Sequence, residues 1–395
     1  MTRRRSSWPH WCASGLGNRS TSARCWGWSC LRAIGTDTAL MQIATIAQKV
    51  SFKGLKSRAQ ECMRAIAEAR GLSRAQLEDR IVPDCGLDGR GSRVFDFGPR
   101  RFSFALGPDM KPLVRHETGA LTTTLPKPGA RDDQALASQA VEQWTLIKKQ
   151  VRAVSRIQAA RLKQAMVTGR RWTVEEFETL LVRHPLMTHL VRLLVWGGYD
   201  QGGRLAATFR VTEDQTYADQ HDEDCTLEGL ATVGIVHPAH LSEDGRAAWG
   251  QLLSDYQIIP PFPQLGRPVH MLAGGEAAAR EITRFTERWV PVELLLGILK
   301  RLGWDRGSPE DGGSFHGHSK PYHEANITAV IEYETVQAGT IFAFEAAIGR
   351  CFFVPGIYTP GMCPDHRDAL LLGEVDPGVL SEVLGDLHVV AGKAQ

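Results

Sequence analysis

The sequence has no apolar run of the roughly 18 residues that a membrane-spanning helix requires. Its longest apolar stretch, which begins at Val290, is interrupted by Glu293 and ends in charged residues. With 43% hydrophobic and 23% charged residues over 395 positions, the composition is that of an ordinary globular protein. We therefore expect a soluble, cytoplasmic protein with enough apolar residues for two or three domains.

Metal-binding motifs are also missing. The eight cysteines form no CxxC pair and no CxxC…HxxxH pattern, which are the usual signatures of structural zinc. We interpret them as free thiols in a reducing compartment. Two groups of histidines are close enough in sequence to be considered as metal ligands. They are His237 with His240, and His316 with His318 and His323. Neither group has a carboxylate or a cysteine at ligand spacing. We therefore predict neither a metal site nor a cofactor.

The sequence contains no complete catalytic motif. It has no GxSxG elbow, and neither Thr168 nor Cys363 lies in a motif that supplies a base. The segment GLDGRG (86–91) lacks the Lys-Ser/Thr pair of a phosphate-binding loop. We leave enzymatic activity open and favour a protein without it.

A run of two aspartates and three glycines at residues 84–91 is typical of either a calcium loop or a turn. If Asp84 is taken as position 1 of an EF-type calcium loop, position 3 is Gly86 and position 12 is Phe95. Both positions should supply oxygen ligands, so two ligands are missing. The dipeptide Asp88-Gly89 is typical of turns. We therefore predict a turn that leads into the first strand.

Residues 1–36 have no acidic residue, although they contain six arginines, three of the eight cysteines and four of the ten tryptophans. They show no helical or strand period and no apolar core of a secretory signal. We interpret them as an unstructured or out-of-frame leader, although an organellar transit peptide has a similar composition. Without them the net charge falls from +2 to −4, so the basic pI is no evidence for nucleic-acid binding.

Apolar periodicity and turn residues predict an α+β fold. Its order is a helical N-terminal part, an antiparallel β-meander, a long central helix with a helical middle, and mixed strands and helices towards the C-terminus. Helices are expected at 39–70, 73–80, from Asp132 or Asp133 to about Thr168, and at 173–185, 187–196, 242–256, 276–289, 292–302 and 377–390. Ser73 with Gln76, and Thr173 with Glu176, have the spacing of capping boxes. Gly197 and Gly198 are expected to end the helix at 187–196. Strands are expected at 92–97, 101–106, 111–115, 120–125, 204–211, 215–219, 231–236, 326–334 and 340–354. We divide the chain into a leader (1–36), the tail of a helical-repeat region (37–83) and an α+β domain (84–391).

Blocks spread over residues 39–391 resemble a known family. They include GLSRAQLEDRIVPDCGLD, FDFGPRRF, LPKPG, AMVTGRRWTVEEFETLLVRHPL, TFRVTED, VGIVHPAHL, DYQIIPPFPQLGRPV and SEVLGDL. The family is a bacterial domain of unknown function found at the C-terminal end of proteins similar to the molybdate-metabolism regulator MolR. Its members often carry an N-terminal WGR module and helical repeats. The resemblance implies a fragment of a longer protein, and it assigns no catalytic or binding residue.

Charges of opposite sign occupy separate segments. Residues 148–171 contain eight basic residues and no acid, whereas residues 213–228 contain seven acids and no Lys or Arg. A solvated face, or docking of one segment on the other, would explain this pattern without a function. The alternative is a binding site for an acidic protein or for nucleic acid. The candidate contacts are Lys148, Arg152, Arg156, Lys163, Arg170 and Arg171.

The function predicted from these features is a non-catalytic regulatory or protein-interaction module. A nucleic-acid-associated module is the first alternative, with the basic segment on phosphates. An enzyme of unrecognised type is the second, with a pocket formed by Trp172, Gln264 and Arg267.

Overall fold

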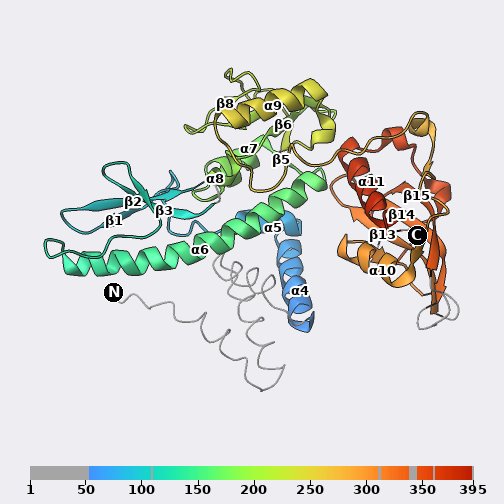
Figure 1. Ribbon diagram of the computed structural model, residues 1–395, viewed down its shortest axis with the longest axis horizontal. Helices are drawn as coiled ribbons and strands as arrows, with labels where there is room; N and C mark the ends of the chain where they lie inside the picture. The colour runs from blue at the N-terminus through green and yellow to red at the C-terminus, as the bar shows by residue number, and fades with distance from the viewer. Residues whose placement is uncertain (1–52, 108–109, 310–312, 338–344, 359–360, 394–395) are drawn as a thin grey trace. The chain divides into compact units, whose positions relative to one another are not determined.

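The computed structural model describes residues 53–107, 110–309, 313–337, 345–358 and 361–393 (Figure 1). The expected leader, 1–36, lies outside them. The chain divides into two compact units. Unit 1 comprises the described residues up to Gly107 together with Lys111–Ser155 and Arg183–Thr188. Unit 2 comprises Met110, Arg156–Val182 and the described residues from His189 onward.

Unit 1 begins with two helices, α4 (Lys53–Ala69) and α5 (Arg74–Arg80). Ser73 and Gln76 form the predicted capping box, in which each side chain accepts a hydrogen bond from the other residue's backbone. The aspartate-rich segment that follows is a turn, as expected. The Asp88 carboxylate accepts hydrogen bonds from the backbone N–H groups of Arg90 and Ser92.

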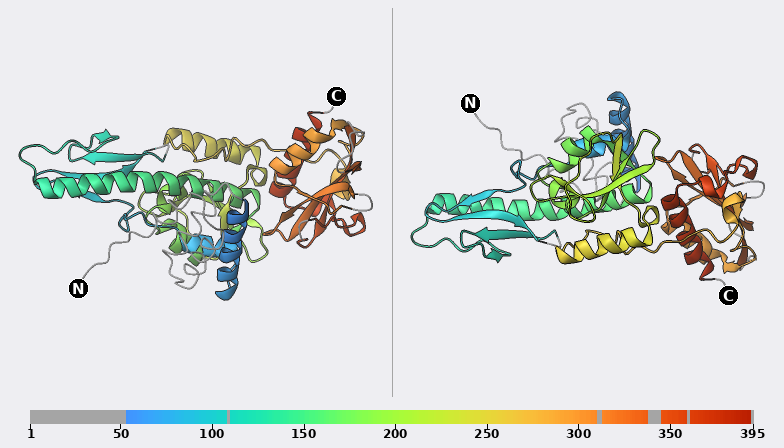
Figure 2. Two further views of the ribbon diagram at one scale, coloured as in Figure 1. Left: turned by 90° about the horizontal axis from the view of Figure 1, so that it is seen from below. Right: turned by 90° about the horizontal axis from the view of Figure 1, so that it is seen from above.

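The predicted meander has the strand order β1-β2-β3-β4, all antiparallel. Its strands are β1 (Val94–Asp96), β2 (Arg101–Leu106), β3 (Pro112–His116) and β4 (Leu121–Thr122). One face packs on the first half of the long helix α6 (Gln134–Val167) (Figure 2). Trp144 on α6 meets Phe95 edge to face at a centroid distance of 5.5 Å. The Asp133 carboxylate caps α6 by accepting from the N–H groups of Ala135 and Leu136.

The first part of unit 2 is a five-stranded antiparallel sheet of order β5-β9-β6-β7-β8. Its strands are β5 (Arg171–Thr173), β6 (Trp196–Tyr199), β7 (Leu205–Val211), β8 (Tyr217–Ala218) and β9 (Thr232–Ile235). The helical segments around it are α7 (Val174–Phe177), a π-helix (Glu178–Val182), α8 (Met187–Val191), a 3-10 turn (Pro238–His240) and α9 (Glu243–Asp255). Phe177 packs on Trp196 at 4.7 Å between ring centroids.

One predicted helix, 187–196, is wrong in its second half. Gly197 and Gly198 were expected to end it, yet they lie inside strand β6 at the centre of the sheet. A Cβ on Gly198 would lie 2.2 Å from the Leu230 side chain, and one on Gly197 would lie 2.6 Å from that of Leu205. These glycines allow close packing over the sheet and do not terminate a helix.

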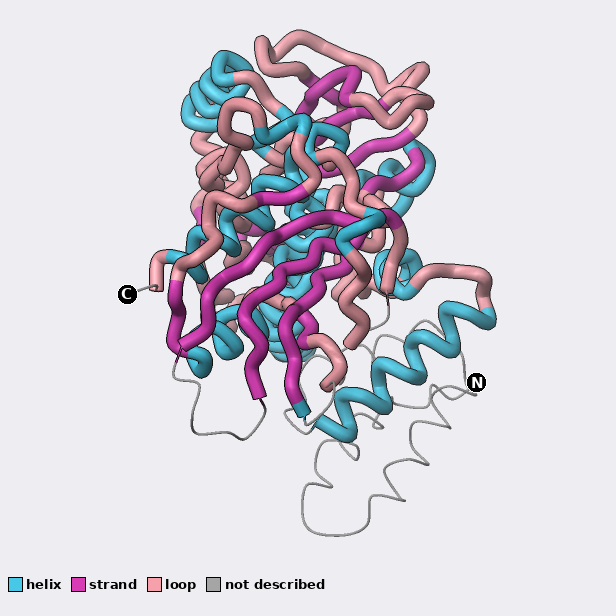
Figure 3. The backbone as a smooth tube through the Cα atoms, turned by 90° about the vertical axis from the view of Figure 1, so that its right-hand side faces the viewer, coloured by secondary structure: helices cyan, strands magenta, loops and turns pink. Residues whose placement is uncertain are grey.

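The C-terminal part of unit 2 is built on a second antiparallel sheet, with order β10-β15-β14-β13-β12 and β11 paired to β15 (Figure 3). Its strands are β10 (Glu281–Ile282), β11 (Trp289–Pro291), β12 (Asp305–Arg306), β13 (Ser314–Tyr322), β14 (Ile327–Gln337) and β15 (Glu345–Pro355). Helices α10 (Val292–Arg301) and α11 (Pro377–Ala391) share its core. Its described residues also include 3-10 turns at Glu276–Ala278, His366–Asp368 and Leu372–Glu374.

Two expectations in this part are wrong. The helix expected at 276–289 is instead a 3-10 turn followed by β10 and the approach to β11, because these segments pair with β15. Residues 314–322, where no strand was expected, form the long strand β13. The α+β class itself is confirmed. Within the described residues, no helix has the length and apolarity needed to cross a membrane.

Candidate binding surface on helix α6

The outer face of α6 carries four solvent-exposed basic side chains: Lys149, Arg152, Arg156 and Lys163. Steps of three, four and seven residues place them in one narrow sector of the helix, because a turn contains about 3.6 residues. The axial rise from the first to the last is about 21 Å at about 1.5 Å per residue. We call these four residues the basic stripe.

No member of the basic stripe makes a side-chain hydrogen bond or an ion pair with another described residue. Helix α6 contains a single acidic residue, Glu142, so the stripe has no carboxylate within its own turns. Leu146 lies three residues before Lys149, on the adjoining part of the surface, and is 56% exposed. Among the described residues, the stripe is therefore a cationic surface without a compensating carboxylate, and it has an apolar side chain beside it.

Other predicted contact residues have internal roles. The Lys148 amino group donates to the Thr123 carbonyl at 3.1 Å and lies over the Trp144 ring. The buried Arg170 guanidinium lies 4.8 Å from the centroid of the Trp172 ring. These two cations therefore support packing within the protein.

Arg171 is also used internally. Its guanidinium stacks on Tyr199 at 3.6 Å from the ring centroid and donates to the Gly203 carbonyl at 2.9 Å. Burial raises the pKa of Tyr199 to about 12, although the Arg171 charge opposes that shift. Of the six predicted contacts, Arg152, Arg156 and Lys163 are thus on the exposed face, and Lys149 joins them.

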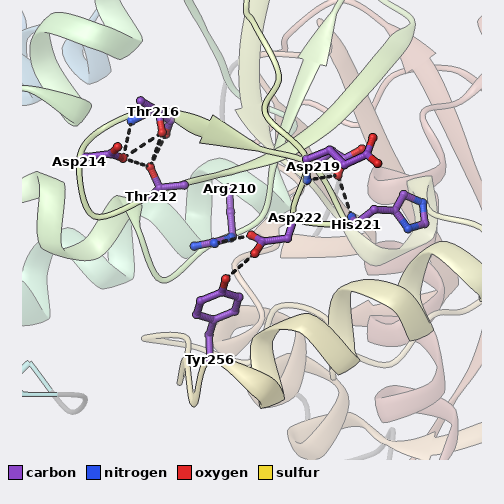
Figure 4. A network of polar contacts seen from close by, with 9 residues as sticks. Arg210, Thr212, Asp214, Thr216, Asp219, His221, Asp222 and Tyr256 are labelled. Atoms are coloured by element: carbon purple, nitrogen blue, oxygen red, sulfur yellow. Dashed lines mark hydrogen bonds and ion pairs between the residues drawn. The ribbon is translucent and has the colours of Figure 1, made fainter.

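The acidic segment 213–228 folds largely on itself. The Asp214 carboxylate closes the β7–β8 hairpin by accepting hydrogen bonds from the hydroxyls of Thr212 and Thr216 (Figure 4). These bonds hold the pKa of Asp214 at about 2. Asp222 binds Arg210 at 2.6 Å. Docking of this segment on the basic stripe is not needed to satisfy these inner carboxylates.

The three residues of the predicted pocket have separate local partners. The Gln264 amide is buried, accepts from the Val195 N–H at 3.0 Å, and donates to the carbonyls of Val195 at 2.7 Å and Val236 at 3.0 Å. Trp172 is buried in β5 and packs on Trp196. Gln264 therefore bridges the backbone of Val195 and Val236 beside the first sheet of unit 2.

The third pocket residue, Arg267, belongs to a buried ionic network on α11 that the sequence did not predict. Glu382 accepts hydrogen bonds from both Nε and Nη2 of Arg267, and its Oε1 lies 3.0 Å from His237 Nε2. Burial raises the pKa of Glu382, but the hydrogen bonds from His237 and Arg267 outweigh it and hold the pKa at about 2. The network joins the segment after β9 to α11 through a fixed negative charge.

Two further acids of this helix region have similar partners. Asp376, the N-cap of α11, lies 3.0 Å from His240 Nε2. Asp386 accepts from Lys320 at 2.7 Å and from the Trp304 indole at 2.9 Å. Together these contacts fasten α11 to the second sheet of unit 2 and to the 3-10 turn after β9.

The histidines of β13 have different surroundings. His318 is buried, and its Nδ1 lies 2.8 Å from the Tyr333 hydroxyl. Burial and the nearby Arg306 charge lower the pKa of His318 to about 4. His323 is exposed at the end of the strand. In the described part of the chain, no group of three or more His, Cys, Asp or Glu side chains is arranged to hold a metal ion.

Comparison with known proteins extends this description. Residues 119–304 match a family model described as a domain of unknown function, DUF4132. The match includes α6 with its basic stripe, the acidic segment and the first sheet of unit 2. The chain is also similar to the uncharacterized protein YehI of Escherichia coli strain K12, with 33% identity over 299 residues.

The alignment with YehI covers 75% of this chain and 24% of YehI, so the matched part spans about a quarter of that relative's length. No solved structure gives a significant match. The predicted presence of a domain of unknown function is therefore confirmed.

Proposed function

We propose that this chain is a non-catalytic, cytoplasmic protein-interaction module whose basic stripe holds an acidic segment of a protein. The observation that carries the proposal is the presence of four exposed cations on one helical face without a described partner. Four unpaired like charges repel one another, and an acidic ligand would relieve that repulsion.

An acidic protein segment fits this surface better than nucleic acid does. The exposed Leu146 beside the stripe offers an apolar contact, which a phosphate backbone cannot use. The aromatic residue of this part of α6, Trp144, is buried against the meander and cannot stack on a base. Charge with an adjoining apolar side chain is typical of a protein interface.

The first prediction concerns binding of an acidic, leucine-containing peptide, measured by fluorescence anisotropy at several salt concentrations. Replacing all four stripe residues by Glu should weaken binding at least about tenfold, because each exposed ion pair contributes a few tenths of a kcal/mol and reversal adds repulsion. Binding to the wild type should weaken as salt rises. Leu146→Ala should also weaken it, without loss of helicity by circular dichroism.

A matched control has the same net charge as the stripe variant. It reverses four exposed basic residues elsewhere: Arg90, Arg115, Lys300 and Arg301. Its peptide affinity should stay within about twofold of wild type, since charges beyond about 8 Å are largely screened at physiological salt. If both variants lost peptide affinity equally, the basic stripe would be rejected as the peptide-binding site. Tighter binding of duplex DNA or single-stranded RNA than of the peptide would support the nucleic-acid alternative instead.

A further inference from the structure

The acidic segment has three carboxylates left over once its hydrogen bonds and the neighbouring Arg192 charge are counted. Asp219 caps the loop by accepting from the N–H groups of His221 and Glu223, and Asp222 is held by Arg210 (Figure 4). Glu213 is also exposed but interacts with the Arg192 charge, which leaves three further exposed acids: Glu223, Asp224 and Glu228. None of these three makes a side-chain hydrogen bond or an ion pair with another described residue. We call them the acidic patch.

The loop that carries the acidic patch is held in a defined shape. The Arg210 guanidinium is buried, lies 4.4 Å from the centroid of the Tyr256 ring, and binds Asp222. The Tyr256 hydroxyl donates to the same carboxylate. The neighbouring carboxylates are therefore presented on an ordered surface, at a low cost in conformational entropy for a ligand.

An apolar residue lies beside the acidic patch, as one does beside the basic stripe. Tyr256 is 51% exposed although its hydroxyl and one ring face are engaged. Ile259, three residues further on, is 56% exposed. Tyrosine is among the residues that contribute most to protein interfaces. Each of the two charged surfaces therefore combines unpaired charges of one sign with an exposed apolar side chain.

We propose that the acidic segment bound by the basic stripe is the acidic patch of a second copy of this chain. This inference rests on the proposed function, and it names the partner. Within the described ranges, neither the basic stripe nor the acidic patch has a partner of opposite charge, so a second copy supplies what each lacks. Tyr256 of one copy and Leu146 of the other add the apolar contact. If the stripe of each copy binds the patch of the other, the two copies form a closed dimer. If each copy binds a different neighbour at each surface, the copies assemble into a linear polymer.

The experiment is a charge-swap complementation with the full 395-residue chain. One variant reverses the stripe to glutamate, and the other reverses the patch with Glu223→Lys, Asp224→Lys and Glu228→Lys. Alone, each variant should self-associate at least about tenfold more weakly than wild type, because it presents two surfaces of one sign. Mixed in equal amounts, the two should associate again, since every stripe then meets a patch of opposite sign. Sedimentation velocity from micromolar to millimolar protein, at low and high salt, measures this.

The outcomes separate this inference from the proposed function. If the stripe variant loses the acidic peptide but wild type stays monomeric throughout, the second copy is rejected and the proposed function stands. If neither the peptide nor self-association depends on the stripe, both fail. Self-association that persists in both single variants, or a mixture that stays monomeric while wild type associates, overturns the inference. The control variant at Arg90, Arg115, Lys300 and Arg301 should associate as wild type does.

Discussion

Glu382→Gln is expected to lower the free energy of unfolding of unit 2 by about 3 kcal/mol at neutral pH. The Glu382 carboxylate is buried and accepts hydrogen bonds from Arg267 and His237. Gln has nearly the same shape and lacks the charge, so it resembles the protonated carboxyl. The pKa falls from its ordinary 4.5 to about 2, and each pKa unit corresponds to roughly 1.4 kcal/mol.

The same substitution should change the pH dependence of stability. Because the folded-state pKa of Glu382 is depressed, its contribution is complete above about 4.5 and is lost as the pH falls towards about 2. The difference between wild type and variant should therefore be constant from neutral pH to about pH 5 and disappear near pH 2. The difference in free energy of unfolding can be measured by urea unfolding at several pH values. Unfolding of unit 2 is monitored by limited proteolysis and mass spectrometry of C-terminal fragments.

Glu374→Gln is the matched control, because Glu374 is an exposed acid in the turn that precedes α11. Glu374→Gln should change the free energy of unfolding by less than about 0.5 kcal/mol at every pH. The ion pair with Arg267 does not stabilise the protein if both substitutions lower the free energy of unfolding equally. The same conclusion holds if Glu382→Gln leaves that free energy unchanged at neutral pH.

The sequence was sufficient to predict the structure of segments whose conformation is determined by residues close to them in the chain. The capping boxes at Ser73 and Thr173 occur as predicted, because the hydrogen bonds that define them span only three residues. The meander and α6 also follow from local patterns, namely a two-residue period with Gly and Pro turns and a long 3.6-residue apolar stripe. The antiparallel neighbours in the meander are consecutive in the chain.

The sequence was insufficient where distant segments decide the structure. Residues 281–282 and 289–291 become strands because β15, about 60 residues later, supplies their hydrogen bonds. Gly197-Gly198 has the composition of a helix stop, but the packing of Leu205 and Leu230 over the sheet determines its role. Local propensity is too weak to overcome such pairing.

The same limit applies to the candidate sites. Spacing predicted a basic face that includes Lys148, Arg152 and Arg156, but burial of Trp144 rotates Lys148 towards the meander and places Lys149 on the outer face. The ionic network of α11 was missed because the partners of Glu382 lie 115 and 145 residues earlier in the chain. Acids four apart in an otherwise apolar helix are the one local signal that points to it.

Trp144→Ala is expected to destabilise unit 1 by about 3 to 5 kcal/mol, because it leaves a cavity where a large aromatic side chain was buried. Trp144 is 5% exposed and meets the rings of both Phe95 and Phe104 from the meander. The loss should appear as faster hydrogen exchange of the amides of β1, β2 and β3, which share this core. Exchange in α11, which lies in unit 2, should change little.

Leu146→Ala on the same helix is the control for that loss. Leu146 lies two residues after Trp144 and is 56% exposed, so its truncation should cost less than about 0.5 kcal/mol. The two variants separate packing from binding: Trp144→Ala lowers stability, whereas Leu146→Ala lowers only affinity for the acidic partner. Equal protection of β1–β3 in wild type and Trp144→Ala would mean that α6 does not hold the meander.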